Sequence, residues 1–184
     1  MTQAKISWYN WLRHTSWLRF WIMLGISLLF LLLFTKYVMI AFFIVLNVIT
    51  SFAWKYLHNR YIAIEFITLS TFVTLYSYGF LAALFVLEIS VFAYMVITMT
   101  FTPNMLLTFP ISAILLLFML PFKPLGIVAV GMMFTIVLNI VLTLIVIMFG
   151  TGRLHRRLIF FATHVMFNWF VLKSIAPQLV HTLS

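Results

Sequence analysis

The chain has 184 residues, of which 66% are hydrophobic and 7% are charged, so its composition excludes an ordinary water-soluble domain, which carries about 25% charged residues. Its eleven lysines and arginines stand against two acidic residues, giving a net charge of +9. Because the apolar runs are continuous rather than alternating, the sequence predicts an all-α bundle of six to seven membrane segments in one integral membrane domain, in contact with the lipid bilayer.

The first 16 residues are polar and aromatic, and they predict an amphipathic segment at the membrane interface. Trp8 and Trp11 fall near one face of a helix there, whereas Arg13 falls elsewhere. Tryptophan and cationic side chains are common at headgroup level, so these three residues predict an interfacial anchor. A docking helix for a cytoplasmic partner is the alternative.

Apolar segments follow, and turn residues and charges divide them. Thr35 and Lys36 predict a tight connection, and Gly79 is the plausible break in a run from 61 to 101 that is too long for one crossing. Pro110 predicts a kink inside a helix, and Pro121 to Gly126 is the strongest loop signal. The predicted segments are 17–34, 37–54, 61–78, 81–101, 104–120, 126–149 and 158–175. Six full spans with one irregular pair is the alternative count.

The cations predict the orientation of the chain. If the N-terminus is cytoplasmic and all seven segments cross, eight of the eleven lysines and arginines lie inside, and Lys36, Lys123 and Lys173 lie outside. This asymmetry follows the positive-inside rule, so a cytoplasmic N-terminus is expected. No basic stripe lies outside the membrane segments, and nucleic acid is therefore not expected as a partner.

Both acidic residues lie inside apolar runs, where an ionisable side chain is expensive and is a functional candidate by default. Glu88 has apolar neighbours, so burial favours its protonated form unless a cavity or a partner stabilises the charge. We expect it to bind a ligand or relay protons, with a neutral hydrogen bond between helices as the alternative. Glu65 is closer to a segment end, where a carboxylate that reaches the headgroups is the alternative to a site role.

Other polar side chains in the apolar segments are candidate partners for these carboxylates: Asn47, Asn139, His164 and Asn168. His164 and Asn168 are four residues apart, so they share one face of the last segment. One interpretation is ligand contact, and the other is hydrogen bonding between helices without a ligand. The sequence has no cysteine and no His-x-x-x-His or Glu-x-x-His spacing, so neither a metal site nor a cofactor is expected. It also lacks hydrolase, P-loop and dinucleotide motifs, so no enzymatic activity is expected.

From about residue 47 to the C-terminus, several short motifs follow one another in an order that can be compared with known membrane protein families. They are Ile64-Glu65-Phe66, Tyr78-Gly79-Phe80, the loop Pro121 to Pro124, Phe167 to Phe170, and Ala176-Pro177. This layout resembles the substrate-capture subunits of energy-coupling-factor transporters and related prokaryotic membrane proteins. The resemblance implies a subunit of a larger transporter in a prokaryotic cell membrane. Such subunits usually dock through small residues at four-residue spacing in the first helix, where this chain offers only Gly25 and Ser27.

Two functions from different classes stay open at this stage. In the first, the protein binds or transports a small solute together with other membrane subunits, and Glu88, His164 and Asn168 line the site. In the second, it is a structural or assembly subunit of a membrane complex and has no solute site. A cavity with these side chains on its wall favours the first function, and packed polar contacts favour the second.

Overall fold

The structure is a computed structural model that describes residues 3–57, 65–101, 103–148 and 154–183, without the side chains of 3–16, 18, 29–33, 57, 103 and 104. Every element in these ranges is helical, so the predicted all-α fold is confirmed. The chain divides into two compact units, Met1–Met39 and Ile40–Ser184, which are described separately.

The first unit consists of the N-terminal part of α1 (Gln3–Leu57). The helix continues through Thr35 and Lys36, so the connection predicted between segments 17–34 and 37–54 is wrong. The reason is local, because no glycine or proline lies near this position to interrupt the backbone hydrogen bonds of the helix. Trp17, Trp21 and Met23 are exposed within this unit, as expected for a helix surrounded by lipid or other apolar partners.

The predicted anchor residues Trp8, Trp11 and Arg13 belong to the backbone of α1, but their side chains lie outside the described residues. The amphipathic anchor therefore stays a prediction. The predicted loop from Gly150 to Gly152 and the start of the predicted segment 61–78 also lie outside the described residues.

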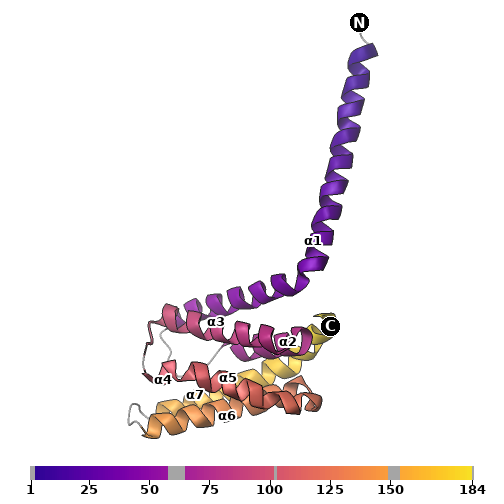
Figure 1. Cartoon of the computed structure of the whole chain (residues 1–184). Helices are drawn as coiled ribbons and strands as arrows, with labels where there is room; N and C mark the ends of the chain where they lie inside the picture. The colour runs from indigo at the N-terminus through magenta and orange to yellow at the C-terminus, as the bar shows by residue number, and fades with distance from the viewer. Residues whose placement is uncertain (1–2, 58–64, 102, 149–153, 184) are drawn as a thin grey trace. The chain divides into compact units, whose positions relative to one another are not determined.

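The second unit is a helical bundle (Figure 1). It contains the end of α1 and the following helices: α2 (Ile67–Tyr78), α3 (Phe80–Thr98), α4 (Pro103–Leu106), α5 (Thr108–Met119), the 3-10 helix η1 (Leu120–Leu125), α6 (Ile127–Met148), α7 (Leu154–Ser174) and α8 (Ala176–Leu183).

Four helical segments in the described residues are long and apolar enough to cross a membrane: Phe34–Tyr56, Phe80–Thr98, Thr108–Leu125 and Ile127–Met148. Helices α7 and α8 form a fifth if the pair, bent by 43°, counts as one span. These helices indicate insertion into a membrane. Six to seven crossing segments stay a prediction.

Helix α2 is short and enclosed by its neighbours. Every side chain from Ile67 to Leu75 is buried. With 12 residues, the helix is about 18 Å long, well below the ~30 Å of a hydrocarbon core. Gly79, with φ of 91°, separates α2 from α3 at the predicted break, and such a backbone conformation strongly favours glycine.

The helix predicted over 104–120 is interrupted three residues before Pro110. The chain breaks at Leu107, between α4 and α5, so Pro110 lies in the first turn of α5. The amide of a first-turn residue has no acceptor within its own helix, so the missing N–H of proline is tolerated there. The predicted loop at Pro121 to Gly126 becomes η1 and the break before α6.

Residues of η1 close one end of the bundle, at the C-terminus of α2. The hydroxyl of Tyr76 donates to the backbone oxygen of Lys123 at 2.7 Å, and Nζ of Lys123 donates to the backbone oxygen of Leu75 at 3.4 Å. A lysine at this position satisfies a carbonyl that the last turn of a helix leaves unpaired. The candidate site lies at the opposite end, where α1 ends and α7 begins.

Candidate functional site

The site is built around Glu65, which comes just before α2. Its Oε1 lies 2.8 Å from Nε2 of His164 on α7. On the other side of the imidazole ring, Nδ1 lies 2.8 Å from Nδ2 of Asn139 on α6. Because the N-terminus of a helix carries partial positive charge, the start of α2 also favours a carboxylate here. One polar chain, the Glu65–His164–Asn139 chain, therefore joins α6, α7 and the start of α2.

Asn139 sets the hydrogen-bonding role of one ring nitrogen of His164. Nδ2 of Asn139 also lies 2.8 Å from the backbone oxygen of Thr135, which identifies this atom as the amide nitrogen rather than the oxygen. An amide N–H can only donate, so Nδ1 of His164 is an acceptor without a proton. Nε2, the other ring nitrogen, faces Oε1 of Glu65 at 2.8 Å, so both nitrogens of the imidazole lie next to polar partners.

Two groups keep Glu65 ionised although it is partly enclosed. Burial by itself would raise the pKa of the Glu65 carboxyl, but His164 and the positive charge of Arg157 bring that pKa below its ordinary value. The guanidinium carbon of Arg157 lies 5.1 Å from the centre of the Phe160 ring. No hydrogen bond joins Arg157 to Glu65 in the described part of the chain, so the two interact through charge alone.

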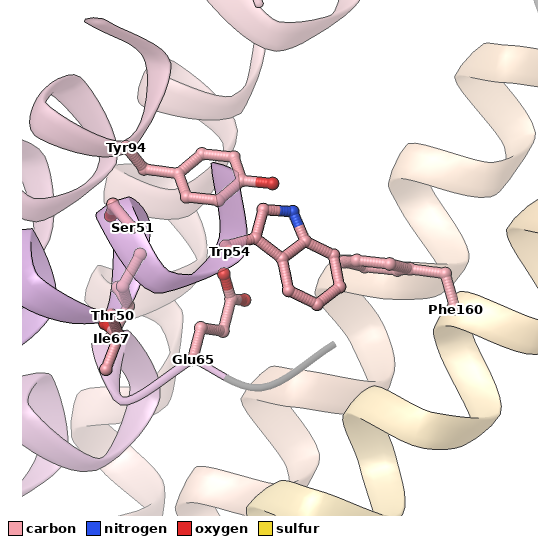
Figure 2. Close-up of a pocket in the computed structure, with 7 residues that line it drawn as sticks. All are labelled: Thr50, Ser51, Trp54, Glu65, Ile67, Tyr94 and Phe160. Atoms are coloured by element: carbon pink, nitrogen blue, oxygen red, sulfur yellow. The ribbon is translucent and has the colours of Figure 1, made fainter. Parts of the chain in front are cut away.

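Glu65 also forms part of the wall of a small pocket, the Glu65 pocket (Figure 2). Its lining residues are Thr50, Ser51 and Trp54 of α1, Glu65, Ile67 of α2, Tyr94 of α3 and Phe160 of α7. Figure 2 shows the Glu65 carboxylate pointing toward the indole ring of Trp54. The free space is about that of one water molecule. The pocket in this conformation is therefore polar on one side, aromatic on the other, and very small.

Asn168 lies one turn after His164, on the face that the sequence predicts for both. Its Nδ2 donates to the backbone oxygen of His164 at 3.0 Å, and its buried Oδ1 has no hydrogen-bond partner among the described residues. The amide thus supports the helix beside the Glu65–His164–Asn139 chain, and it is not part of the pocket wall.

Glu88 lies apart from this site. Its Oε1 accepts a hydrogen bond of 3.4 Å from the hydroxyl of Ser112 on α5. Within the described residues, no hydrogen bond or ion pair joins Glu88 to His164 or Asn168, so the structure does not bring these three predicted site residues together. The carboxylate that meets His164 is Glu65.

Asn47 belongs to a second polar cluster next to the pocket. Its Nδ2 donates to the hydroxyls of Ser70 at 2.8 Å and Ser90 at 2.9 Å, which joins α1, α2 and α3. Contacts of this kind hold helices together in membranes without any ligand. The backbone oxygen of Asn47 accepts hydrogen bonds from Thr50 and Ser51, and these two hydroxyls connect the cluster to the Glu65 pocket.

Sequence reasoning missed most of the pocket wall. A usable signal was present on α1, because Asn47, Ser51 and Trp54 follow one another at spacings of four and three and so share one helix face. Tyr94 and Phe160 carry no such signal, since aromatic side chains are frequent throughout the chain.

The arrangement offers no metal centre: the described residues contain no group of three or more His, Cys, Asp or Glu side chains that could hold an ion. No family model, no curated protein and no solved structure matches the chain.

Proposed function

We propose that this protein is a membrane subunit that binds a small solute at the Glu65 pocket and moves it with the help of other membrane proteins. The observation that carries the proposal is the Glu65 carboxylate, held by the Glu65–His164–Asn139 chain on the wall of the pocket. Charged side chains among membrane helices are costly, and they usually mark substrate or ion sites.

The way in which Glu65 is held supports a binding role. A structural contact between α2 and α7 needs no charge, because a neutral amide at position 65 could accept the same hydrogen bond from His164. The chain instead places an ionised carboxylate there and fixes its direction through two supporting side chains. Binding sites are built in this way, with the contacting group oriented by a second layer of hydrogen bonds.

The transport role and the partners rest on the sequence. Glu65 lies within Ile64-Glu65-Phe66, one of the motifs that resemble substrate-capture subunits of energy-coupling-factor transporters. The sequence has no P-loop, so energy for transport would come from a partner protein. A prokaryotic cell membrane is the location that this resemblance favours.

A second candidate function is a structural or assembly subunit of a membrane complex. The observation in its favour is that the pocket has room for about one water molecule, while the polar groups of Asn47, Ser70 and Ser90 are packed against one another. In that case the polar contacts only hold the bundle together, and the exposed apolar side chains bind other subunits.

Purification from native membranes tests the two functions against each other. Wild-type protein and the variants Glu65→Gln and Glu88→Gln are isolated, and bound small molecules and co-purifying proteins are identified by mass spectrometry. We expect a solute with the wild type and with Glu88→Gln, and its loss from Glu65→Gln. A partner protein bound equally to all three, without any solute, would favour the assembly function.

A further inference from the structure

The polar groups that Thr50, Ser51 and Glu65 contribute to the wall of the pocket act as hydrogen-bond acceptors, whereas Trp54 and Tyr94 also carry an indole N–H and a phenol hydroxyl. The hydroxyls of Thr50 and Ser51 donate to the backbone oxygen of Asn47 at 3.0 and 2.7 Å. A hydroxyl has one hydrogen, so these two groups present only oxygen lone pairs to anything else that they contact. Oε1 of Glu65 lies 2.8 Å from Nε2 of His164, and the other carboxylate oxygen makes no hydrogen bond to a described residue. A ligand that contacts Thr50, Ser51 and Glu65 therefore has to donate hydrogen bonds to them.

The other walls of the pocket are aromatic. Trp54, Tyr94 and Phe160 line it together with Glu65 (Figure 2). The faces of aromatic rings carry negative electrostatic potential and attract cations, most strongly for tryptophan. Arg157 already makes such a contact with Phe160. An anion would be repelled by the negative charge of Glu65 and by the negative potential of the ring faces. The lining therefore favours a positively charged hydrogen-bond donor.

The free space in the pocket and the net charge of the groups around it restrict the choice of ligand further. The free space, about that of one water molecule, is close to the size of an ammonium ion, which donates in four tetrahedral directions. We infer that the Glu65 pocket binds ammonium or the ammonium end of a primary amine. This inference rests on the solute-binding function proposed above and names its substrate class. Because the positive charge of Arg157 already offsets that of Glu65, we expect a Kd on the order of millimolar.

The test is thermal unfolding of the full-length protein in detergent, titrated with ammonium chloride, methylammonium chloride, potassium chloride and sodium chloride at equal ionic strength. We expect a saturable rise in Tm with ammonium and no comparable rise with sodium or potassium. A smaller effect of methylammonium identifies free ammonium as the ligand, whereas an equal or larger effect identifies the primary amine.

Two sets of variants locate the binding site. Glu65→Gln removes the charge and keeps a similar shape, and it should lower the apparent affinity at least about tenfold, while Glu88→Gln should not change it. Trp54→Phe keeps an aromatic wall and should retain binding, whereas Trp54→Leu should lose it. If Glu65→Gln does not fold, the comparison of Trp54→Phe with Trp54→Leu still locates the binding site.

Three results would overturn the assignment: an equal Tm shift with potassium, an unchanged ammonium effect in Glu65→Gln, or equal affinities in Trp54→Leu and Trp54→Phe. No shift with any of the four salts also overturns it. If a solute of another class binds the wild type but not Glu65→Gln, only the ammonium assignment would be refuted. The solute-binding function would then stand.

Discussion

The side chain of Asn139 has two hydrogen-bond partners, the backbone oxygen of Thr135 and Nδ1 of His164. Replacing Asn139 with leucine leaves the buried Nδ1 of His164 without a donor, which should cost about 1 to 3 kcal/mol of stability. Thr143→Val is the matched control, because the Thr143 hydroxyl bonds within its own helix to the backbone oxygen of Asn139. Thermal or denaturant unfolding of both variants measures the difference. Equal losses in the two would mean that the Glu65–His164–Asn139 chain has no special role in stability.

The lowered pKa of Glu65 predicts how stability depends on pH. A carboxyl whose pKa is lower in the folded state than in the unfolded state stabilises the fold at pH values above its ordinary pKa of 4.5. This stabilisation is lost as the pH falls through the folded pKa. Between about pH 5 and pH 3, the Tm of the wild type should therefore fall more steeply than that of Glu65→Gln. Parallel Tm curves for the two proteins would contradict the assignment of this group as an ionised, stabilised carboxylate.

At the scale of helices, Gly131 sets the distance between α6 and α7. A Cβ atom added there would lie 2.7 Å from Cδ1 of Leu172, whose side chain is fully buried. Gly131→Ala should therefore destabilise the protein by about 1 to 3 kcal/mol, measured by unfolding. Because Leu172→Ala removes the clash, the double variant Gly131→Ala/Leu172→Ala should be less destabilised than the sum of the two single variants. A double variant whose destabilisation equals the sum of the two single variants would show that the two residues are not coupled.

Helix breaks could be predicted from the sequence where a residue needs or imposes special backbone dihedral angles. They could not be predicted elsewhere. Gly79 and the Pro121 to Gly126 stretch indicated their breaks because they need or impose special dihedral angles. The connection predicted at Thr35 and Lys36 rested only on the polarity of these two residues. Polar residues alone do not end a helix. Pro110 indicated an interruption of the helix over 104–120, but the proline alone does not show that the new helix starts at Thr108.

The candidate site was predictable as a set of residues but not as an arrangement. Glu65, His164 and Asn139 stood out because they are polar in apolar segments. Their mutual contacts depend on how α6, α7 and the start of α2 meet, and no local pattern encodes this. For the same reason Glu88, the more deeply placed carboxylate by sequence, could not be separated from the His164 site before the bundle was known.

For the whole molecule, the cations at the two ends of the bundle predict its orientation. Lys55, Arg156 and Arg157 lie at the end that holds the Glu65 pocket, whereas Lys123 lies in η1 at the other end. By the positive-inside rule, we expect the pocket to lie on the cytoplasmic side.

Single cysteines in this cysteine-free chain test the orientation. Met99 at the end of α3 and Leu125 at the end of η1 are both exposed and lie at opposite ends of the bundle. Leu125→Cys should react with a membrane-impermeant thiol reagent in intact cells, and Met99→Cys should react only after permeabilisation. The reverse labelling pattern would show that the bundle has the opposite orientation.

The central claim is that the Glu65 pocket binds a small solute, and ligand-dependent thermal stability tests it most directly. Wild type, Glu65→Gln and Glu88→Gln are each unfolded by heat in the presence of a panel of small amines, carboxylates and neutral polar solutes. The predicted result is that at least one class raises the Tm of the wild type and of Glu88→Gln, with the rise lost or strongly reduced in Glu65→Gln. A panel that stabilises none of the proteins, or that stabilises Glu65→Gln as well as the wild type, would contradict the claim.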